Sequence, residues 1–299
     1  GDETLLGHKP FLVIADRLTR AGIAVFRYDD RGVGQSGGRD QLENATSKDF
    51  ADDAAAVVEF LKTQPQIDPK RIGLIGHSEG GLIAPMVATQ RDDVAFIVLL
   101  AGPGVTGREI LELQGRLILK AEGQSDEDIE KFSAQQKKVL DLALSGASKE
   151  EITKAIEDIR DDAMAEVAPA SQPQGESDKK SALEKEQVEA QAQAVNNAWM
   201  KYFLTYDPRP TLGKVKCPVL AVNGTLDLQV WHDQNLPEIE KALKASGADF
   251  TIKRYDNLNH LFQPAKTGGM SEYAASEITF DDAVISDVIA WIKAKMNSQ

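Results

Sequence analysis

Helix-like and strand-like segments alternate along residues 11–102, and this alternation is the strongest constraint on the fold. Phe11, Ile14 and Leu18 recur at helical spacing, and residues 23–28 follow them as an apolar strand. Alternation of this kind is typical of a parallel sheet whose strands are joined by crossover helices. The sequence therefore predicts an α/β fold with a mostly parallel sheet.

The same pattern predicts where the other core elements lie. The segment at residues 94–101 is apolar without interruption, which is typical of a strand buried on both faces of a sheet. Further strands are expected at residues 72–76, 218–223 and 250–255, and further helices at residues 47–64, 79–90, 238–246 and 280–296.

Residues 105–205 interrupt this alternation, because no convincing strand occurs among them. Ser125 with Asp128, and Ser148 with Glu151, have the spacing of capping boxes, and each opens an amphipathic stretch. We therefore expect a helical lid or cap inserted into the core.

The insertion divides the chain into three parts. Within it, the Ser-, Gln- and Pro-containing residues 169–180 are expected to form a disordered link. The predicted organisation is a first part of the α/β core at residues 1–104, the helical insertion at 105–205 and a second part of the core at 206–299.

The charge of the chain argues against two classes of partner. The formal net charge is −13, so nucleic acid and anionic membrane surfaces would be repelled. No apolar run approaches the length of a membrane span, and a small-molecule ligand is the expected partner. No signal peptide is visible, and the sequence leaves open whether the protein is cytoplasmic or exported.

The segment at residues 76–80 carries the strongest chemical signal, because it reads Gly-His-Ser-Glu-Gly. A G-x-S-x-G pattern alone is weak, but here an apolar strand turns directly into a helix at the motif. Such a turn projects the Ser78 hydroxyl above the edge of the sheet. The backbone amide of Glu79, at the start of the following helix, is then the expected first donor of an oxyanion hole.

A serine nucleophile needs a base and an acid that orients the base. In this type of fold the acid follows one later strand and the histidine follows the next. Asp227 follows the strand at 218–223, and His260 follows the strand at 250–255. We therefore predict Ser78 as nucleophile, His260 as base and Asp227 as acid.

Several alternatives compete with parts of this assignment. Asp233 and Asp256 are rivals for the acid, whereas His232 is expected to be structural because too few residues separate it from Asp227. The Gly-rich loop around Arg31 lacks the features of a phosphate-binding loop, so a structural turn is favoured, with Arg31 bonding backbone carbonyls.

No cofactor or metal is expected. No two histidines lie three to five residues apart and the chain has one cysteine, so the ligand spacing of a metal site is missing.

Four motifs in register resemble those of bacterial α/β-hydrolase esterases related to serine aminopeptidases. They read RYDDRG at residues 27–32, GHSEGG at 76–81, NG followed by DLQV within 223–230, and NHLFQ at 259–263. The resemblance implies an α/β-hydrolase fold with helices inserted over the site. It also implies hydrolysis of carboxylic esters by Ser78, Asp227 and His260.

One departure from the family leads to a further expectation. Family members carry additional strands before the position of Phe11, and a glycine-rich loop there supplies the second oxyanion amide. This chain starts at Gly1, after the place of that loop. The absent strand would lie between residues 23–28 and 72–76, where backbone groups would otherwise lack partners. We therefore expect a missing N-terminal segment of the same protein.

The expected function is cleavage of carboxylic esters with short to medium acyl chains through an acyl-enzyme on Ser78. An aminopeptidase or amidase with the same triad is one alternative. A non-catalytic binding protein that acts through the acidic helical insertion is another.

Overall fold

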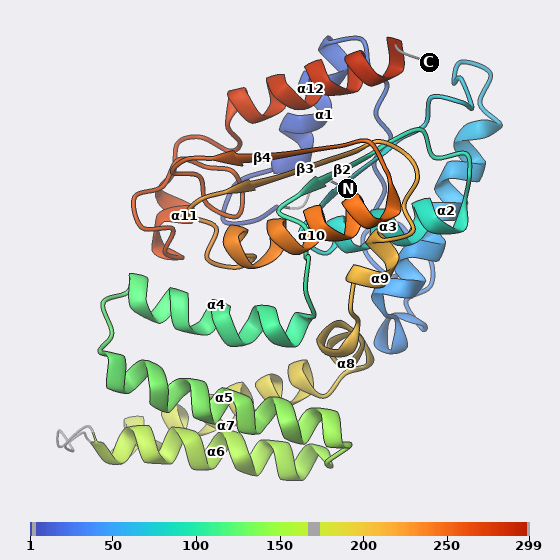
Figure 1. The fold of residues 1–299 in the computed structure, drawn as a ribbon. Helices are drawn as coiled ribbons and strands as arrows, with labels where there is room; N and C mark the ends of the chain where they lie inside the picture. Colours follow the sequence, from blue (N-terminus) through green and yellow to red (C-terminus); the bar gives the residue numbers. More distant parts are fainter. Residues whose placement is uncertain (2–3, 167–173, 298–299) are drawn as a thin grey trace.

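The computed structural model describes residues 1, 4–166 and 174–297, and its centre is a parallel sheet (Figure 1). The sheet has the order β1 (Leu74–His77), β2 (Ile97–Leu100), β3 (Val219–Gly224) and β4 (Phe250–Tyr255). All three pairings are parallel. The expected α/β fold with a parallel sheet is therefore confirmed.

Helices cover both faces of this sheet (Figure 1). One face carries α1 (Pro10–Arg20) and α12 (Asp282–Asn297), and the other carries α2 (Ser47–Lys62), α3 (Gly80–Gln90), α9 (Arg209–Leu212) and α10 (His232–Ser246). Two short elements, η1 (Leu42–Asn44) and α11 (Ser271–Ala275), lie in the loops.

The side chains of β2 alternate between the two halves of the core. Val98 and Leu100 pack in the cluster with α1 and α12, whereas Ile97 and Leu99 pack in the cluster with α2, α3 and α10. All four are almost fully buried. This is why the strand reads as an unbroken apolar run: both of its faces are covered.

Five helices lie within residues 105–205, between β2 and β3 along the chain, and most of them extend to one side of the sheet (Figure 1). They are α4 (Gly107–Ala121), α5 (Asp126–Ser145), α6 (Lys149–Glu166), α7 (Gln174–Val195) and α8 (Ala198–Thr205). Ser125 and Ser148 cap α5 and α6 as predicted: their Oγ atoms accept from the amides of Asp128 (3.1 Å) and Glu151 (3.2 Å).

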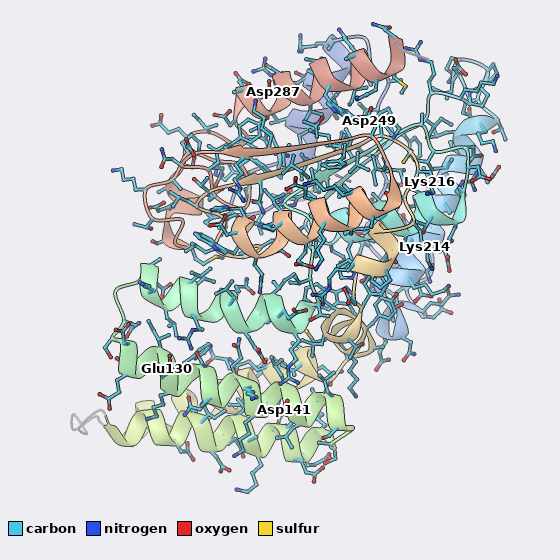
Figure 2. All side chains as sticks on the ribbon, in the orientation of Figure 1. Glu130, Asp141, Lys214, Lys216, Asp249 and Asp287 are labelled. Carbon is cyan, nitrogen blue, oxygen red and sulfur yellow. The ribbon has the colours of Figure 1, made fainter. Side chains whose placement is uncertain are left out.

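Ion pairs fasten the first two of these helices to each other. Glu130 and Asp141 both lie on α5 (Figure 2), where Arg116 of α4 bonds Glu130 at 2.5 Å and Arg108 of α4 bonds Asp141 at 2.6 Å. These pairs are partly exposed, so each contributes modestly, and they favour one register of α4 on α5 rather than supplying much stability.

The strand expected at residues 23–28 is wrong, because the structure has no strand there. A β-strand exists only where a neighbour accepts its hydrogen bonds, and among the described residues no strand pairs with this segment. Its apolar side chains stay partly exposed, for example Phe26 at 47%.

The disordered link expected at residues 169–180 is also wrong in its second half. Residues 174–180 belong to α7, and residues 169–173 lie outside the described part of the chain. Gly175 is the only glycine between Gln174 and Val195, and no proline follows it in that range, so the polar composition did not prevent a helix.

Several boundaries also moved. The strand expected at residues 94–101 is shorter, and α10 begins at His232 rather than at residue 238. In the part of the chain that the structure describes, no helix has the length and apolar character needed to cross a bilayer.

Candidate active site

Ser78 lies in the turn between β1 and α3 and has a left-handed backbone conformation, with φ at +53°. Its amide donates to the carbonyl of Leu100 at 2.9 Å, so the turn is fastened to the end of β2. A non-glycine residue in this conformation costs roughly 1–3 kcal/mol, and such residues cluster at functional sites. Because β1 ends at His77, Ser78 lies at the carboxyl edge of the sheet.

Two glycines make this turn possible, for steric reasons. A Cβ on Gly76 would overlap the carbonyl oxygen of Gly80, and a Cβ on Gly81 would lie 2.5 Å from the Cα of Gly102. Gly80, the last residue of the G-x-S-x-G motif, has no atom within 4 Å of its Cβ position. The close contacts therefore fall on Gly76 and Gly81.

The start of α3 faces the same region as Ser78. The first amides of a helix have no carbonyl partner within the helix, and they carry the positive end of its dipole. Glu79 is the N-cap residue of α3, and Gly80 is the first helical residue. Their amides are suited to stabilise negative charge that develops beside Ser78.

Asp227 and His260 are brought together by the ends of β3 and β4. His260 Nδ1 lies 2.9 Å from Asp227 Oδ2, and both side chains are buried. The other carboxylate oxygen, Oδ1, accepts from the amides of Gln229 and Val230 at 2.9 Å each. The carboxylate is thus held by backbone amides and fixes the imidazole with Nε2 directed away from it.

Close approach of the two loops depends on Gly224. A Cβ at this position would collide with the carbonyl oxygen of Leu258, two residues before His260. Asn259 also stiffens the loop, because its Oδ1 accepts from the amides of Leu261 and Gln263 at 3.0 Å each.

The rival acid Asp233 lies elsewhere. Its carboxylate is 57% exposed and lies 3.1 Å from Arg254 Nη2 and 3.1 Å from His232 Nδ1. His232 begins α10 and takes no part in the Asp227–His260 pair. The structure therefore pairs Asp227, rather than Asp233, with His260.

Arg31 bonds a backbone carbonyl, as expected, but this carbonyl belongs to α2 rather than to the Gly-rich loop. It donates to the carbonyl of Asp49 at 3.0 Å. It also makes a two-pronged ion pair with Asp53, at 2.7 Å on each oxygen, a contact that the sequence analysis did not foresee.

His77 is a residue of the site that the sequence analysis passed over. Its Nε2 lies 2.8 Å from the carbonyl oxygen of His260, and the two rings are 4.7 Å apart. Burial lowers the pKa of His77 to about 3, so the ring is neutral at ordinary pH and donates through Nε2. The available signal was its position inside the motif, directly before Ser78.

Ser78 and His260 line one cavity of about 2190 Å³, which is also lined by Trp199 and Gln229. Within the described chain, the Ser78 hydroxyl has no direct hydrogen bond to His260. Hydrogen bonds of this kind are often long before substrate binds, so the shared cavity and the fixed imidazole are the relevant geometry.

We expect Gly76→Ala to lower the free energy of unfolding by at least about 2 kcal/mol, because the added methyl group meets backbone that cannot move aside. Gly80→Ala is the matched control from the same motif and is expected to change stability by less than about 1 kcal/mol. Urea denaturation of both variants measures this. Equal effects of the two substitutions would contradict the steric account.

Comparisons with known proteins agree with this fold. A segment is 42% identical over 81 residues to a thiohydrolase of Arthrinium phaeospermum; it covers 26% of this chain and about a quarter (25%) of that relative. An 85-residue segment is 34% identical to an uncharacterized protein of Mycobacterium tuberculosis, with 28% of each chain covered.

Among solved structures, the α/β hydrolase GrgF from Penicillium is similar over 96% of this chain and 84% of its own, with a TM-score of 0.54 at 15% identity. At this identity the likeness concerns the fold alone. The family model described as serine aminopeptidase, S33, matches residues 10–263. This chain therefore belongs to the S33 serine aminopeptidase-like family of α/β hydrolases.

Proposed function

We propose that this protein is a serine hydrolase that cleaves carboxylic esters with short to medium acyl chains. The observation that carries the proposal is the buried bond between Asp227 and His260, together with a cavity that both His260 and the strained Ser78 line. Membership of a hydrolase family supports the view that the protein is an enzyme.

The first stage of the reaction forms an acyl-enzyme. Ser78 Oγ attacks the ester carbonyl carbon while its proton passes to His260 Nε2, and the Glu79 amide donates to the oxyanion. The bond to the alcohol oxygen then breaks, and His260 returns its proton to the departing alcohol. Asp227 holds the imidazole in the required tautomer and stabilises its charged form.

The second stage releases the acid. Water attacks the acyl carbon and gives a proton to His260, and the acyl–oxygen bond to Ser78 breaks as the imidazole reprotonates the serine. In this proposal, helices α4 to α8 form a lid over the cavity. No cofactor is needed by this sequence of steps.

Ser78→Ala is expected to abolish labelling by a fluorophosphonate and to lower kcat for p-nitrophenyl butyrate by at least about 10⁴-fold, because no other hydroxyl occupies the turn. Ser286→Ala is the matched control: this serine lies on α12 and bonds the Asp282 carbonyl. It is expected to keep full labelling. The parent protein is the protein purified from its source, with any segment that accompanies these residues. If it is not labelled, the proposal is contradicted and a binding role for the acidic helical insertion remains.

Amide hydrolysis is the second candidate, because the matching family model describes a serine aminopeptidase. The same triad serves both reactions, and a substrate comparison separates them. We expect kcat/KM to be higher for p-nitrophenyl butyrate than for an aminoacyl p-nitroanilide. A higher value for the anilide would favour the aminopeptidase.

We further propose that an extended, apolar segment of the same protein pairs with β1 and fills the part of the cavity beside this strand, which leaves the part lined by Ser78, His260 and Trp199 for the substrate. Among the described residues β1 bonds only β2, which leaves its other edge unpaired. Apolar side chains remain exposed around the gap: Phe26 and Phe60 lie with ring centroids 5.7 Å apart and are about half exposed. Unpaired backbone beside apolar surface favours another strand.

Such a segment would end near Ser78 and supply the second oxyanion amide. We therefore expect mass spectrometry of the active protein from its source to show a chain heavier than 32.5 kDa, or a second polypeptide that copurifies. A single species of 32.5 kDa that is folded and active would contradict this part of the proposal.

A further inference from the structure

The side chain of Glu79 connects the nucleophile turn to two helices. Its Oε1 accepts from Ser47 Oγ and from Trp199 Nε1, each at 2.6 Å. Ser47 is the first residue of α2 and is fully buried, whereas Trp199 lies on α8, in the helical insertion. One carboxylate oxygen therefore joins core and insertion at the residue that follows Ser78.

The surroundings of this carboxylate make its hydrogen bonds important. Burial raises the pKa of Glu79 above its ordinary value, although the bonds from Ser47 and Trp199 favour the ionised form. A carboxylate in such a place is stabilised mainly by the donors that reach it. Removing the acceptor leaves a half-buried indole N–H without its partner.

Trp199 itself is held on more than one side. Its ring stacks on Phe203, with centroids 5.4 Å apart and planes within 3° of parallel. The helix that carries both rings is capped by Asn197, whose Oδ1 accepts from the amide of Met200 at 2.6 Å. The indole lines the same cavity as Ser78 and His260.

We infer that Trp199 is a specificity-determining residue and that Glu79, through its side chain, is the positioning residue that orients it. The indole forms an apolar wall of the substrate cavity, suited to the hydrocarbon part of an ester. The hydrogen bond from its N–H to Glu79 fixes this wall relative to the nucleophile turn. This inference rests on the proposed esterase function and names the substrate class: esters with an extended apolar group.

The test compares two substrates, p-nitrophenyl octanoate and p-nitrophenyl acetate, by the ratio of their kcat/KM values. A smaller amount of folded enzyme cancels in this ratio, so a merely structural role would not change it. Trp199→Phe keeps an aromatic ring but removes the N–H. We expect Trp199→Phe and Glu79→Ala each to lower the octanoate-to-acetate ratio about 5- to 10-fold. Each removes the one hydrogen bond to a charged acceptor that orients the indole.

Three further variants complete the design. Glu79→Gln keeps an acceptor oxygen and is expected to restore most of the ratio. The double variant, Glu79→Ala with Trp199→Phe, is expected to be no worse than either single variant, because the two act through one bond. Trp291→Phe is the control. Trp291 lies on α12, and the substitution removes a similar indole N–H bond, to Thr251 Oγ1 at 3.1 Å. It is expected to leave the ratio unchanged.

The outcomes distinguish this inference from the proposed function. If the parent protein is labelled at Ser78 and hydrolyses both esters, but Trp199→Phe leaves the ratio unchanged, the inference is wrong and the proposed function stands. Additive losses in the double variant would likewise overturn it. If the parent protein is not labelled at Ser78, both fall together. Should Glu79→Ala fail to fold, Trp199→Phe decides alone.

Discussion

The sharp backbone turn at Ser78 is the constraint on which the rest of the site depends. The turn requires a left-handed conformation from a serine, and it exists because Gly76 lets the first turn of α3 pass against the end of β1. The strain is held by the core on both sides of the sheet, since β1 and β2 are fixed by parallel pairing. As a result, the Ser78 hydroxyl lies beside the first backbone amides of α3.

The parallel sheet then determines which other residues reach this turn. Because carboxyl ends of parallel strands share one edge, the loops after β3 and β4 deliver Asp227 and His260 to the same side as Ser78. Gly224 allows the loops to touch, and His77 bonds the carbonyl of His260 and so links it to the turn at Ser78. The order of the strands in the sheet therefore brings Ser78, Asp227 and His260, which are far apart in sequence, to one edge.

How much of the fold and the site could be predicted from the sequence depends on how far apart along the chain the interacting residues lie. The buried strand near residues 94–101 could be predicted because a local run of apolar residues marks it. Asp227 and His260 could be predicted because each directly follows a recognisable strand. The strand at 23–28 failed because pairing depends on a neighbour, which no local pattern reveals. The bond between Glu79 and Trp199 spans 120 positions and has no local signal at all.

We propose that Ser78, His260 and Asp227 act as one proton relay, and a crystal structure of the fluorophosphonate adduct tests this most directly. We expect phosphorus on Ser78 Oγ, a phosphoryl oxygen that accepts from the Glu79 amide, and His260 Nε2 within about 3.2 Å of the serine oxygen. Phosphorus on another residue, or an imidazole that stays out of reach of Ser78 in the adduct, would contradict it.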